Sequence, residues 1–229
     1  MILYSDKTKL TPIGGDKSAW PVYMTIGNIK SDVRNRVSSH AWVPIAYLPI
    51  VKFSDNSDLN GLCIARFYHQ CMAIVMKMLL PVEANGVDLI DSSGNICHCF
   101  TRIGVYMADY PEQCLVNCVG YKSSPNFDAT SSDLGDNTPG DILTYGLLMT
   151  DIRSLRDEYE EPSMQKMLDC LKKARKMRLS GVLHPWWEHH LGYQPWRVIT
   201  PDILHGLHKF FRDHLFKWVQ WLIRKAEYD

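Results

Sequence analysis

Residues 1–27, MILYSDKTKLTPIGGDKSAWPVYMTIG, contain two apolar segments separated by a polar stretch. Met1 to Ser5 predicts a short strand that ends at Asp6. The Gly-Gly pair at 14–15 predicts a turn, because glycine adopts the backbone angles that tight turns require. Trp20 to Gly27 is rich in β-forming residues and apolar on both faces, which is typical of a buried central strand. The stretch therefore predicts two strands of a sheet, with an acidic residue directly after the first.

A third strand, a helix, a hairpin and a fourth strand are predicted next along the chain. Residues 42–48, WVPIAYL, are β-rich, although Pro44 weakens the assignment since proline cannot donate to a neighbouring strand. Between residues 61 and 80 the apolar residues recur at helical spacing, and Pro81 is expected to end that helix. The runs that flank a Ser-Ser-Gly-Asn turn predict a hairpin, and an apolar strand that ends at Asp109 follows it. These elements are Val87–Ile90 with Ile96–Phe100 for the hairpin and Ile103–Ala108 for the strand.

The second half of the chain is predicted to be mainly helical. Residues 123–140 are rich in Ser, Asp, Asn and Pro, which indicates a long loop. Helices are expected at Asp141–Leu155 and Ser163–Arg178, followed by an aromatic loop at His184–Pro195. A long final helix is expected at Pro201–Ala226, because Thr200 is a good N-cap.

Three consecutive strands, a helix and a further strand form the core order of the ribonuclease H-like fold. We therefore predict an α/β fold with a ribonuclease H-like mixed sheet, an added β-hairpin and C-terminal helices. The first part of this core is expected at 1–122, a linker loop at 123–140, and a helical region at 141–229. The last region is either an insertion or an incomplete remainder of the core.

Composition and charge exclude some classes of protein. The 229 residues are 46% hydrophobic, which is ordinary for a globular chain and argues against disorder. The 25 basic and 25 acidic residues balance, whereas a stand-alone nucleic-acid-binding module normally has an excess of Lys and Arg. A nuclease-like domain that holds metal on carboxylates and takes basic surface from other domains remains compatible with this balance.

Neither a signal peptide nor a membrane span is predicted. The N-terminus lacks a basic start and a long apolar core, and no apolar run reaches the length of a transmembrane helix. The seven cysteines are odd in number and irregularly spaced, which favours a reduced, intracellular chain.

Asp6 and Asp109 are the candidate metal ligands. Each directly follows a predicted strand, and in a ribonuclease H-like sheet those two strands are neighbours. Two carboxylates at adjacent strand ends can share Mg²⁺ or Mn²⁺, which activates a water or a 3′-hydroxyl for attack on a phosphodiester. By spacing alone, the simpler interpretation is that both are turn acids after strands.

The predicted final helix carries two further features. Asp202 and His205 are three residues apart, so on a helix they share one face. The simpler interpretation is that Asp202 caps the helix and His205 is an ordinary core or surface histidine. Trp218 and Trp221 form an apolar stripe with leucines one turn away, so this helix is expected either to face the core or to bind a partner.

Three sequence blocks resemble Plavaka transposases, a fungal group similar to CACTA (En/Spm) elements. They lie in the family's order and cover nearly the whole chain. The blocks are ILYSDKTKLTPIGGDKSAWPVYMTIGNI at 2–29, YMADYPEQCLVNC at 106–118 and HPWWEHHLGYQPWRVITPDILHGLHKFFRDHLFKW at 184–218.

The resemblance implies a ribonuclease H-like catalytic core with an acidic triad and two divalent metals, Mg²⁺ or Mn²⁺. It also implies a nuclear protein that binds DNA at transposon ends, with homo-oligomers a further expectation. The first two acids of the family pattern correspond to Asp6 and Asp109, and a D-x-x-H signature corresponds to Asp202 and His205. The third acid, usually Glu, is expected in a later helix beyond residue 229, since Glu227 is too close to the end.

The sequence departs from the family pattern after the second acid. Relatives carry a C-P-x-C element there, whereas Ser124 and Phe127 occupy the two cysteine positions. Relatives also have a zinc-finger region before the first strand. We therefore expect a fragment of a cut-and-paste DNA transposase, a truncated catalytic core that is inactive alone. The alternatives are a domesticated scaffold protein that binds a partner through its Trp-rich final helix, and an active nuclease that uses Asp6, Asp109 and Asp202.

Overall fold

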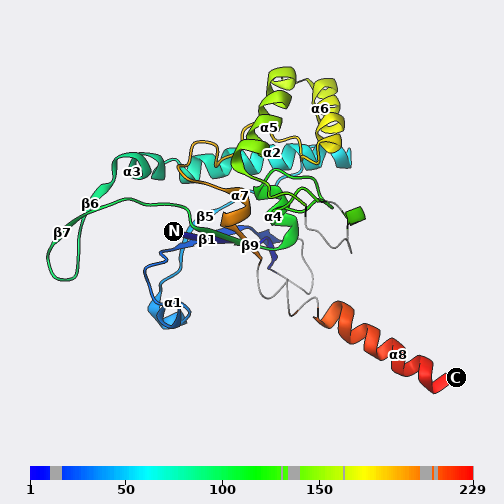
Figure 1. The fold of residues 1–229 in the computed structure, drawn as a ribbon, viewed down its shortest axis with the longest axis horizontal. Helices are drawn as coiled ribbons and strands as arrows, with labels where there is room; N and C mark the ends of the chain where they lie inside the picture. The colour runs from blue at the N-terminus through cyan, green and yellow to red at the C-terminus, as the bar shows by residue number, and fades with distance from the viewer. Residues whose placement is uncertain are drawn as a thin grey trace.

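The computed structural model describes residues 1–10, 17–129, 131–133, 140–161, 163–201, 208 and 211–228. These residues form a mixed α/β fold around a five-stranded sheet with the order β5-β4-β1-β8-β9 (Figure 1). β4 is antiparallel to β1 and β5, while β1, β8 and β9 run parallel. The strands are β1 (Ile2–Ser5), β4 (Pro21–Thr25), β5 (Val43–Tyr47), β8 (Val105–Ala108) and β9 (Ile199–Pro201).

The four predicted sheet strands are confirmed, since β1, β4, β5 and β8 each fall inside the predicted range. Pro44 lies in β5, an edge strand, where a missing hydrogen-bond donor is tolerated. β4 is central, and the expectation that it is buried holds in part, since Val22 and Thr25 are buried while its other residues are half-buried. Val22 is buried on the face that the helices cover, whereas Tyr23 is half-buried and stacks on Tyr4 with ring centroids 6.2 Å apart.

The predicted helix at 61–80 is observed as two helices, α2 (Ser57–Met76) and α3 (Leu79–Asn85). α2 starts earlier than predicted because the Asn56 side chain accepts hydrogen bonds from the amides of Asp58 and Leu59 and caps it. Pro81 does not end a helix but lies in the first turn of α3, where a missing N–H breaks no intrahelical bond.

Other local elements lie around the sheet. The predicted hairpin is confirmed as β6 (Val87–Ile90) with β7 (Ile96–Cys99), which projects from the body of the protein at the left of Figure 1. A short ribbon pairs β2 (Thr8–Lys9) with β3 (Ser18–Ala19). Between β4 and β5 the chain forms the one-turn helices α1 (Ser31–Arg34) and η1 (Val37–Ser39).

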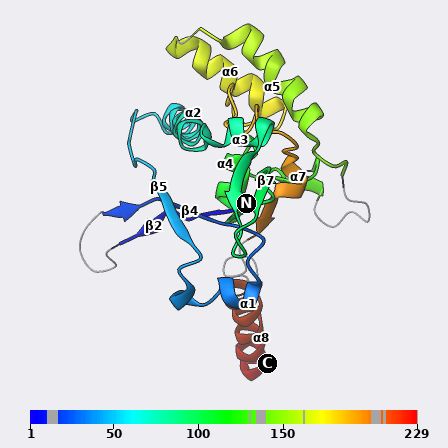
Figure 2. The ribbon, with the colours of Figure 1, turned by 90° about the vertical axis from the view of Figure 1, so that its left-hand side faces the viewer.

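Two predicted helices form a pair above the sheet, α5 (Tyr145–Tyr159) and α6 (Met164–Lys176). α5 starts after its predicted position because Thr144 caps it through the amide of Leu147. The short helices α4 (Tyr110–Val116) and α7 (Pro195–Val198) were not predicted from the sequence. Figure 2 shows α2, α5 and α6 on one side of the sheet and α8 on the other.

The predicted final helix is confirmed only in its last part. β9 occupies 199–201, so the segment predicted as helical, 141–229, also supplies an edge strand of the sheet. A π-helical turn at Phe211–Phe216 continues into α8 (Lys217–Tyr228). None of the described helices is long and apolar enough to cross a membrane.

The aromatic loop at 184–195 packs into the core. Trp187 is completely buried, stacks on Tyr193 with ring centroids 5.0 Å apart, and donates from Nε1 to the carbonyl of Val116 at 2.7 Å. His190 is also buried, and its Nδ1 lies 3.0 Å from Oε1 of Glu83. Trp187 and His190 are therefore part of the core.

Candidate metal-binding acidic site

Asp6 and Asp109 follow neighbouring parallel strands. The register of β1 and β8 pairs Ile2 with Val105 and Tyr4 with Met107. Continuing this register by two residues sets Asp6 opposite Asp109. The fold therefore brings the two candidate acids to the same edge of the sheet.

Each of these carboxylates makes one local hydrogen bond. Asp109 is the N-cap of α4, and its Oδ1 accepts from the amide of Glu112 at 3.0 Å. Oδ2 of Asp6 accepts from the Thr8 hydroxyl at 2.9 Å. Both residues are half-buried. Among the described residues, no hydrogen bond to the second oxygen of either carboxylate is found.

Glu112 is a third acid at this edge and was not predicted from the sequence. It is 6% exposed, and its Oε1 accepts from Oγ of Ser5 and, at 3.2 Å, from Nε1 of Trp20. Burial raises the pKa of Glu112 to about 7, and repulsion from Asp109 and Asp6 adds to the rise, while the two hydrogen bonds oppose it. The Glu112 carboxyl group therefore lies deeper in the protein than the half-buried Asp6 and Asp109. It loses its proton near neutral pH.

The signal for Glu112 in the sequence is the D-Y-P-E pattern at 109–112, which resembles a capping box with proline in the first turn. That pattern predicts α4 correctly. It would also send the Glu112 side chain back to the amide of Asp109, at the surface. Instead the side chain turns inward, because Ser5 and Trp20 offer donors in the core.

A chain of hydroxyl groups continues from Ser5 into the core. The hydroxyls of Ser5 and Tyr106 lie 2.6 Å apart, and those of Tyr106 and Tyr68 lie 2.8 Å apart. Burial raises the pKa of both tyrosines well above the usual value, so both remain protonated donors. The chain links β1, β8 and α2 and holds the strand ends that precede the acids in a single arrangement.

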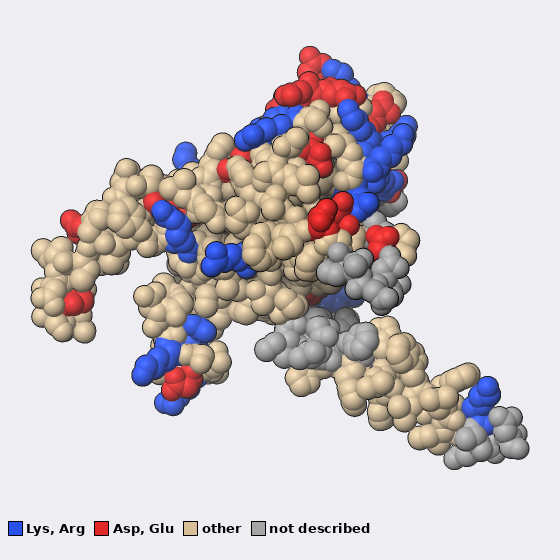
Figure 3. All heavy atoms as spheres, in the orientation of Figure 1, with Lys and Arg blue, Asp and Glu red and all other residues tan. Residues whose placement is uncertain are grey.

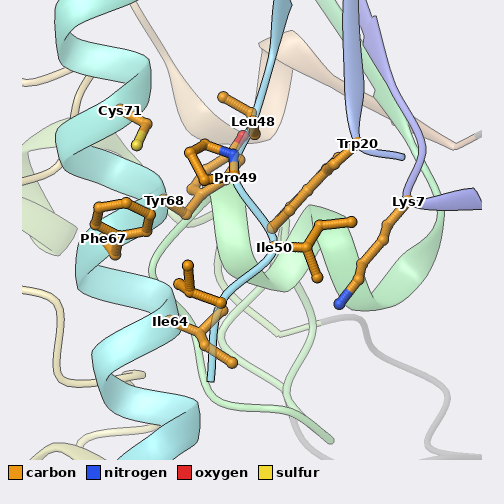
Figure 4. A pocket seen from close by; sticks show the side chains of 10 residues that line it. Lys7, Trp20, Leu48, Pro49, Ile50, Ile64, Phe67, Tyr68 and Cys71 are labelled. Atoms are coloured by element: carbon orange, nitrogen blue, oxygen red, sulfur yellow. The ribbon is translucent and has the colours of Figure 1, made fainter. Parts of the chain in front are cut away.

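Figure 4 shows the crevice beside this network, between Lys7, Trp20 and the side of α2. The Lys7 ammonium lies 5.8 Å from the centre of the Trp20 ring. The crevice has a volume of about 10 Å³, which is room for about one water molecule. The crevice is therefore too small to hold a substrate, and Trp20 closes this side of the site.

The sequence model of the Plavaka transposase family matches residues 1–219 of the chain. The chain belongs to the Plavaka transposase family. This confirms the resemblance drawn from the three sequence blocks. Comparison with curated proteins and with solved structures found no significant match.

Membership of the Plavaka family implies DNA binding and suggests a divalent metal. The carboxylates of Asp6 and Asp109 are hard oxygen ligands of the kind that Mg²⁺ and Mn²⁺ prefer. Within the described residues, however, no group of three His, Cys, Asp or Glu side chains is arranged to hold a metal ion. The described part of this Plavaka transposase chain therefore fits such a metal only in part. Asp202 and His205 lie outside the described residues, directly after β9 in the sequence.

The loop that departs from the Plavaka pattern is closed by hydrogen bonds. Oγ of Ser124 accepts from the amides of Asn126 at 3.3 Å and Phe127 at 3.1 Å. Asn117 donates from its side-chain amide to the carbonyl of Pro125 at 2.8 Å. The turn thus keeps a defined shape with serine and phenylalanine at the family's cysteine positions.

Proposed function

We propose that this chain derives from a cut-and-paste DNA transposase and that Asp6 and Asp109 are two of its metal-binding acids. The observation that carries the proposal is the position of both carboxylates directly after adjacent parallel strands. Mg²⁺ or Mn²⁺ on these residues would activate a water or a 3′-hydroxyl for attack on a DNA phosphodiester. A nuclear location is part of the same proposal, since the substrate is chromosomal DNA.

The sheet supports a ribonuclease H-like core. In such a core the first strand and the strand after the helix are neighbours. Here β1 lies between β4 and β8, and α2 and α3 precede β8 in the chain. This arrangement makes the two strand-terminal acids neighbours, which the sequence order alone could not do.

We further propose that the chain by itself has little strand-transfer activity. Asp6 and Asp109 are two candidate ligands, whereas the Glu112 carboxyl group is buried and bonded to Ser5 and Trp20, and a transposase of this type depends on three acids. Loss of one ligand leaves charge in the transition state unstabilised and lowers the rate by orders of magnitude.

The metal ligands are tested by Mn²⁺ binding, measured by electron paramagnetic resonance. Asp6→Asn and Asp109→Asn are each expected to weaken binding by more than about tenfold. Asp91→Asn, in the hairpin turn, is the matched control and should bind as the unchanged chain does. Equal binding by all four proteins would reject Asp6 and Asp109 as ligands.

The activity is tested separately with terminal-repeat DNA and Mn²⁺ in a strand-transfer assay. We expect no product above the level of Asp6→Ala. Clear strand transfer that disappears in Asp6→Ala would show a complete enzyme and contradict the proposed low activity.

A second candidate is a scaffold protein that binds a partner through α8. The observation that favours it is the exposure of Trp218 and Trp221, at 57% and 60%. A defined homo- or hetero-complex in solution would support this function, whereas irregular aggregation would support the first proposal.

A further inference from the structure

A groove of about 420 Å³ opens between the start of α2, the end of α6 and the segment Gly120–Ser123. Its walls include Asp58 and Gly61 of α2, Tyr121, and the two arginines Arg175 and Arg178.

Both arginines of the groove are positioned by acids. The Arg175 guanidinium donates to both carboxylate oxygens of Asp58, at 2.7 and 3.0 Å, and Arg178 pairs with Asp128. The Arg175 and Asp58 side chains are 53% and 52% exposed. Water screens such a pair, so it contributes little stability and another anion can replace the carboxylate. A phosphate fits the guanidinium fork as well as a carboxylate does.

More basic side chains surround the groove. Figure 3 shows Lys and Arg gathered along the right-hand side of the molecule, where α6 ends. Lys172 and Lys176 are exposed on the last turns of α6, and Lys122 is exposed beside Tyr121. Lys172 pairs with Asp169, so this surface carries acids as well as basic side chains. The balanced charge of the whole chain is therefore compatible with several basic side chains beside this groove.

An aromatic pair connects the groove with the acidic site. The Tyr121 side chain is 68% exposed, and its ring centre lies 5.6 Å from that of Tyr110. Tyr110 directly follows Asp109. In Figure 1, the start of α2, the end of α6 and the carboxyl ends of β1 and β8 all lie toward the right.

Backbone strain also concentrates at this groove. Among the described residues, Cys118, Lys122 and Arg178 are three of the four non-glycine residues with positive φ, at 60°, 80° and 60°. They lie where Val119 bridges to Leu179. Such conformations are unfavourable for side chains with a Cβ, and they cluster at binding and catalytic sites.

We propose that this α2–α6 groove binds the phosphate backbone of DNA and leads the strand to Asp6 and Asp109. Arg175 and Arg178 contact phosphates, and Asp58 competes with the phosphate for Arg175. This inference rests on the proposed function, because the DNA bound in the groove is the substrate of the proposed transposase reaction.

Opposite substitutions in the Arg175–Asp58 pair test the groove. Binding of a short fluorescein-labelled duplex, and of its single strand, is measured by anisotropy with EDTA present, so that metal does not contribute. Arg175→Gln is expected to weaken binding by about tenfold and to reduce the salt dependence by about one phosphate contact. Asp58→Asn is expected to tighten binding, because it frees the guanidinium and removes a negative charge. Arg36→Gln and Asp32→Asn, an exposed pair on and beside α1, are the matched controls.

A substitution at Gly61 tests the same surface without removing an arginine. A Cβ at Gly61 would meet no other atom within 4 Å, and the residue is itself exposed, so larger side chains fit the fold. Gly61→Glu adds a negative charge to the groove and is expected to weaken DNA binding. Gly61→Gln has the same size and is expected to bind more tightly than Gly61→Glu.

The proposal is overturned if Arg175→Gln and Gly61→Glu bind DNA as the unchanged chain does, or if Arg36→Gln has an equal effect. Competition by polyglutamate at the same charge concentration as DNA would reject a nucleic acid as the ligand. Asp6→Asn should weaken Mn²⁺ binding but should not weaken DNA binding in EDTA. Loss of Mn²⁺ binding by the acids and loss of DNA binding by the groove are thus separate outcomes, and either proposal can fail alone.

Discussion

At the scale of single residues, Glu112 connects the two candidate acids. Its amide donates to Asp109, and its carboxyl group accepts from Ser5, the residue before Asp6. The folded pKa of about 7 lies above the model-compound value of 4.5, so the folded protein binds this proton more tightly than the unfolded chain. Below about pH 4.5 Glu112 is protonated in both states, and its contribution to the free energy of unfolding is fully present. This contribution is lost as the pH rises through about 7, and the loss is on the order of 3 kcal/mol.

Glu112→Gln is expected to remove this pH dependence. Glutamine keeps an oxygen that accepts from Ser5 and Trp20 but never ionises. At about pH 8 the variant should be more stable than the unchanged chain by on the order of 3 kcal/mol, while at about pH 4.5 the two should nearly agree. Urea unfolding at a series of pH values measures the difference.

The comparison of these two proteins also removes the effect of His69. Burial lowers the pKa of His69 to about 4, so its contribution to stability rises with pH, opposite in sign to that of Glu112. Because His69 is the same in both proteins, its effect cancels. Parallel pH profiles for Glu112→Gln and the unchanged chain would show that Glu112 is not the group responsible.

At the scale of elements, the aromatic segment 184–195 joins α4, the sheet and α5. Trp187 contacts Tyr193 and Val116, and its ring also lies against Tyr145 of α5, with centroids 5.8 Å apart. Val116 and Tyr145 belong to other parts of the chain, whereas Tyr193 belongs to the segment itself. The local sequence predicted an aromatic loop here but not these contacts.

Trp187→Ala is expected to lower the free energy of unfolding by about 3–5 kcal/mol, because it leaves a cavity and removes the hydrogen bond to Val116. Trp221→Ala, at a 60% exposed position on α8, should change stability by less than about 0.5 kcal/mol. Thermal unfolding followed by far-ultraviolet circular dichroism compares the two. A similar effect of both substitutions would contradict the assignment of Trp187 to the core and α8 to the exterior.

The observed strands and helices show which local signals are reliable. Runs of apolar residues predicted β1, β4, β5 and β8 within a few residues. A strand of four or five residues is long enough for its apolar pattern to be recognised in the sequence. β9 has three residues and no such repeat, and Thr200 with Pro201 resembled the start of a helix. Its pairing with β8 is a long-range contact that outweighs this local signal.

At the scale of the whole molecule, apolar surface is exposed on α8 and on the β6–β7 hairpin. Trp218 and Trp221 of α8 and Ile90 and Ile96 of the hairpin are all more than half exposed. The chain has no net charge at pH 7 and a pI of about 7.1, so electrostatic repulsion between copies is weak. These two properties together favour association in neutral solution.

A Trp218→Gln, Trp221→Gln double variant is expected to have a lower average mass than the unchanged chain at equal concentration near pH 7. The reason is the loss of the largest apolar side chains from the exposed face of α8. Size-exclusion chromatography with light scattering measures the mass. Val37→Gln removes a 92% exposed apolar side chain elsewhere and should leave the mass unchanged. If the double variant also leaves it unchanged, α8 does not drive association.

The sequence by itself determined the family, four of the sheet strands, the hairpin and the positions of Asp6 and Asp109 directly after two strands. These features depend on residue type and local spacing, which a linear chain displays. Only the tertiary structure decided that Glu112 turns into the core, that β9 joins the sheet, and that Arg175 meets Asp58 across a groove. Each depends on contacts between residues far apart in the chain, and such contacts form only when the helices pack on the sheet.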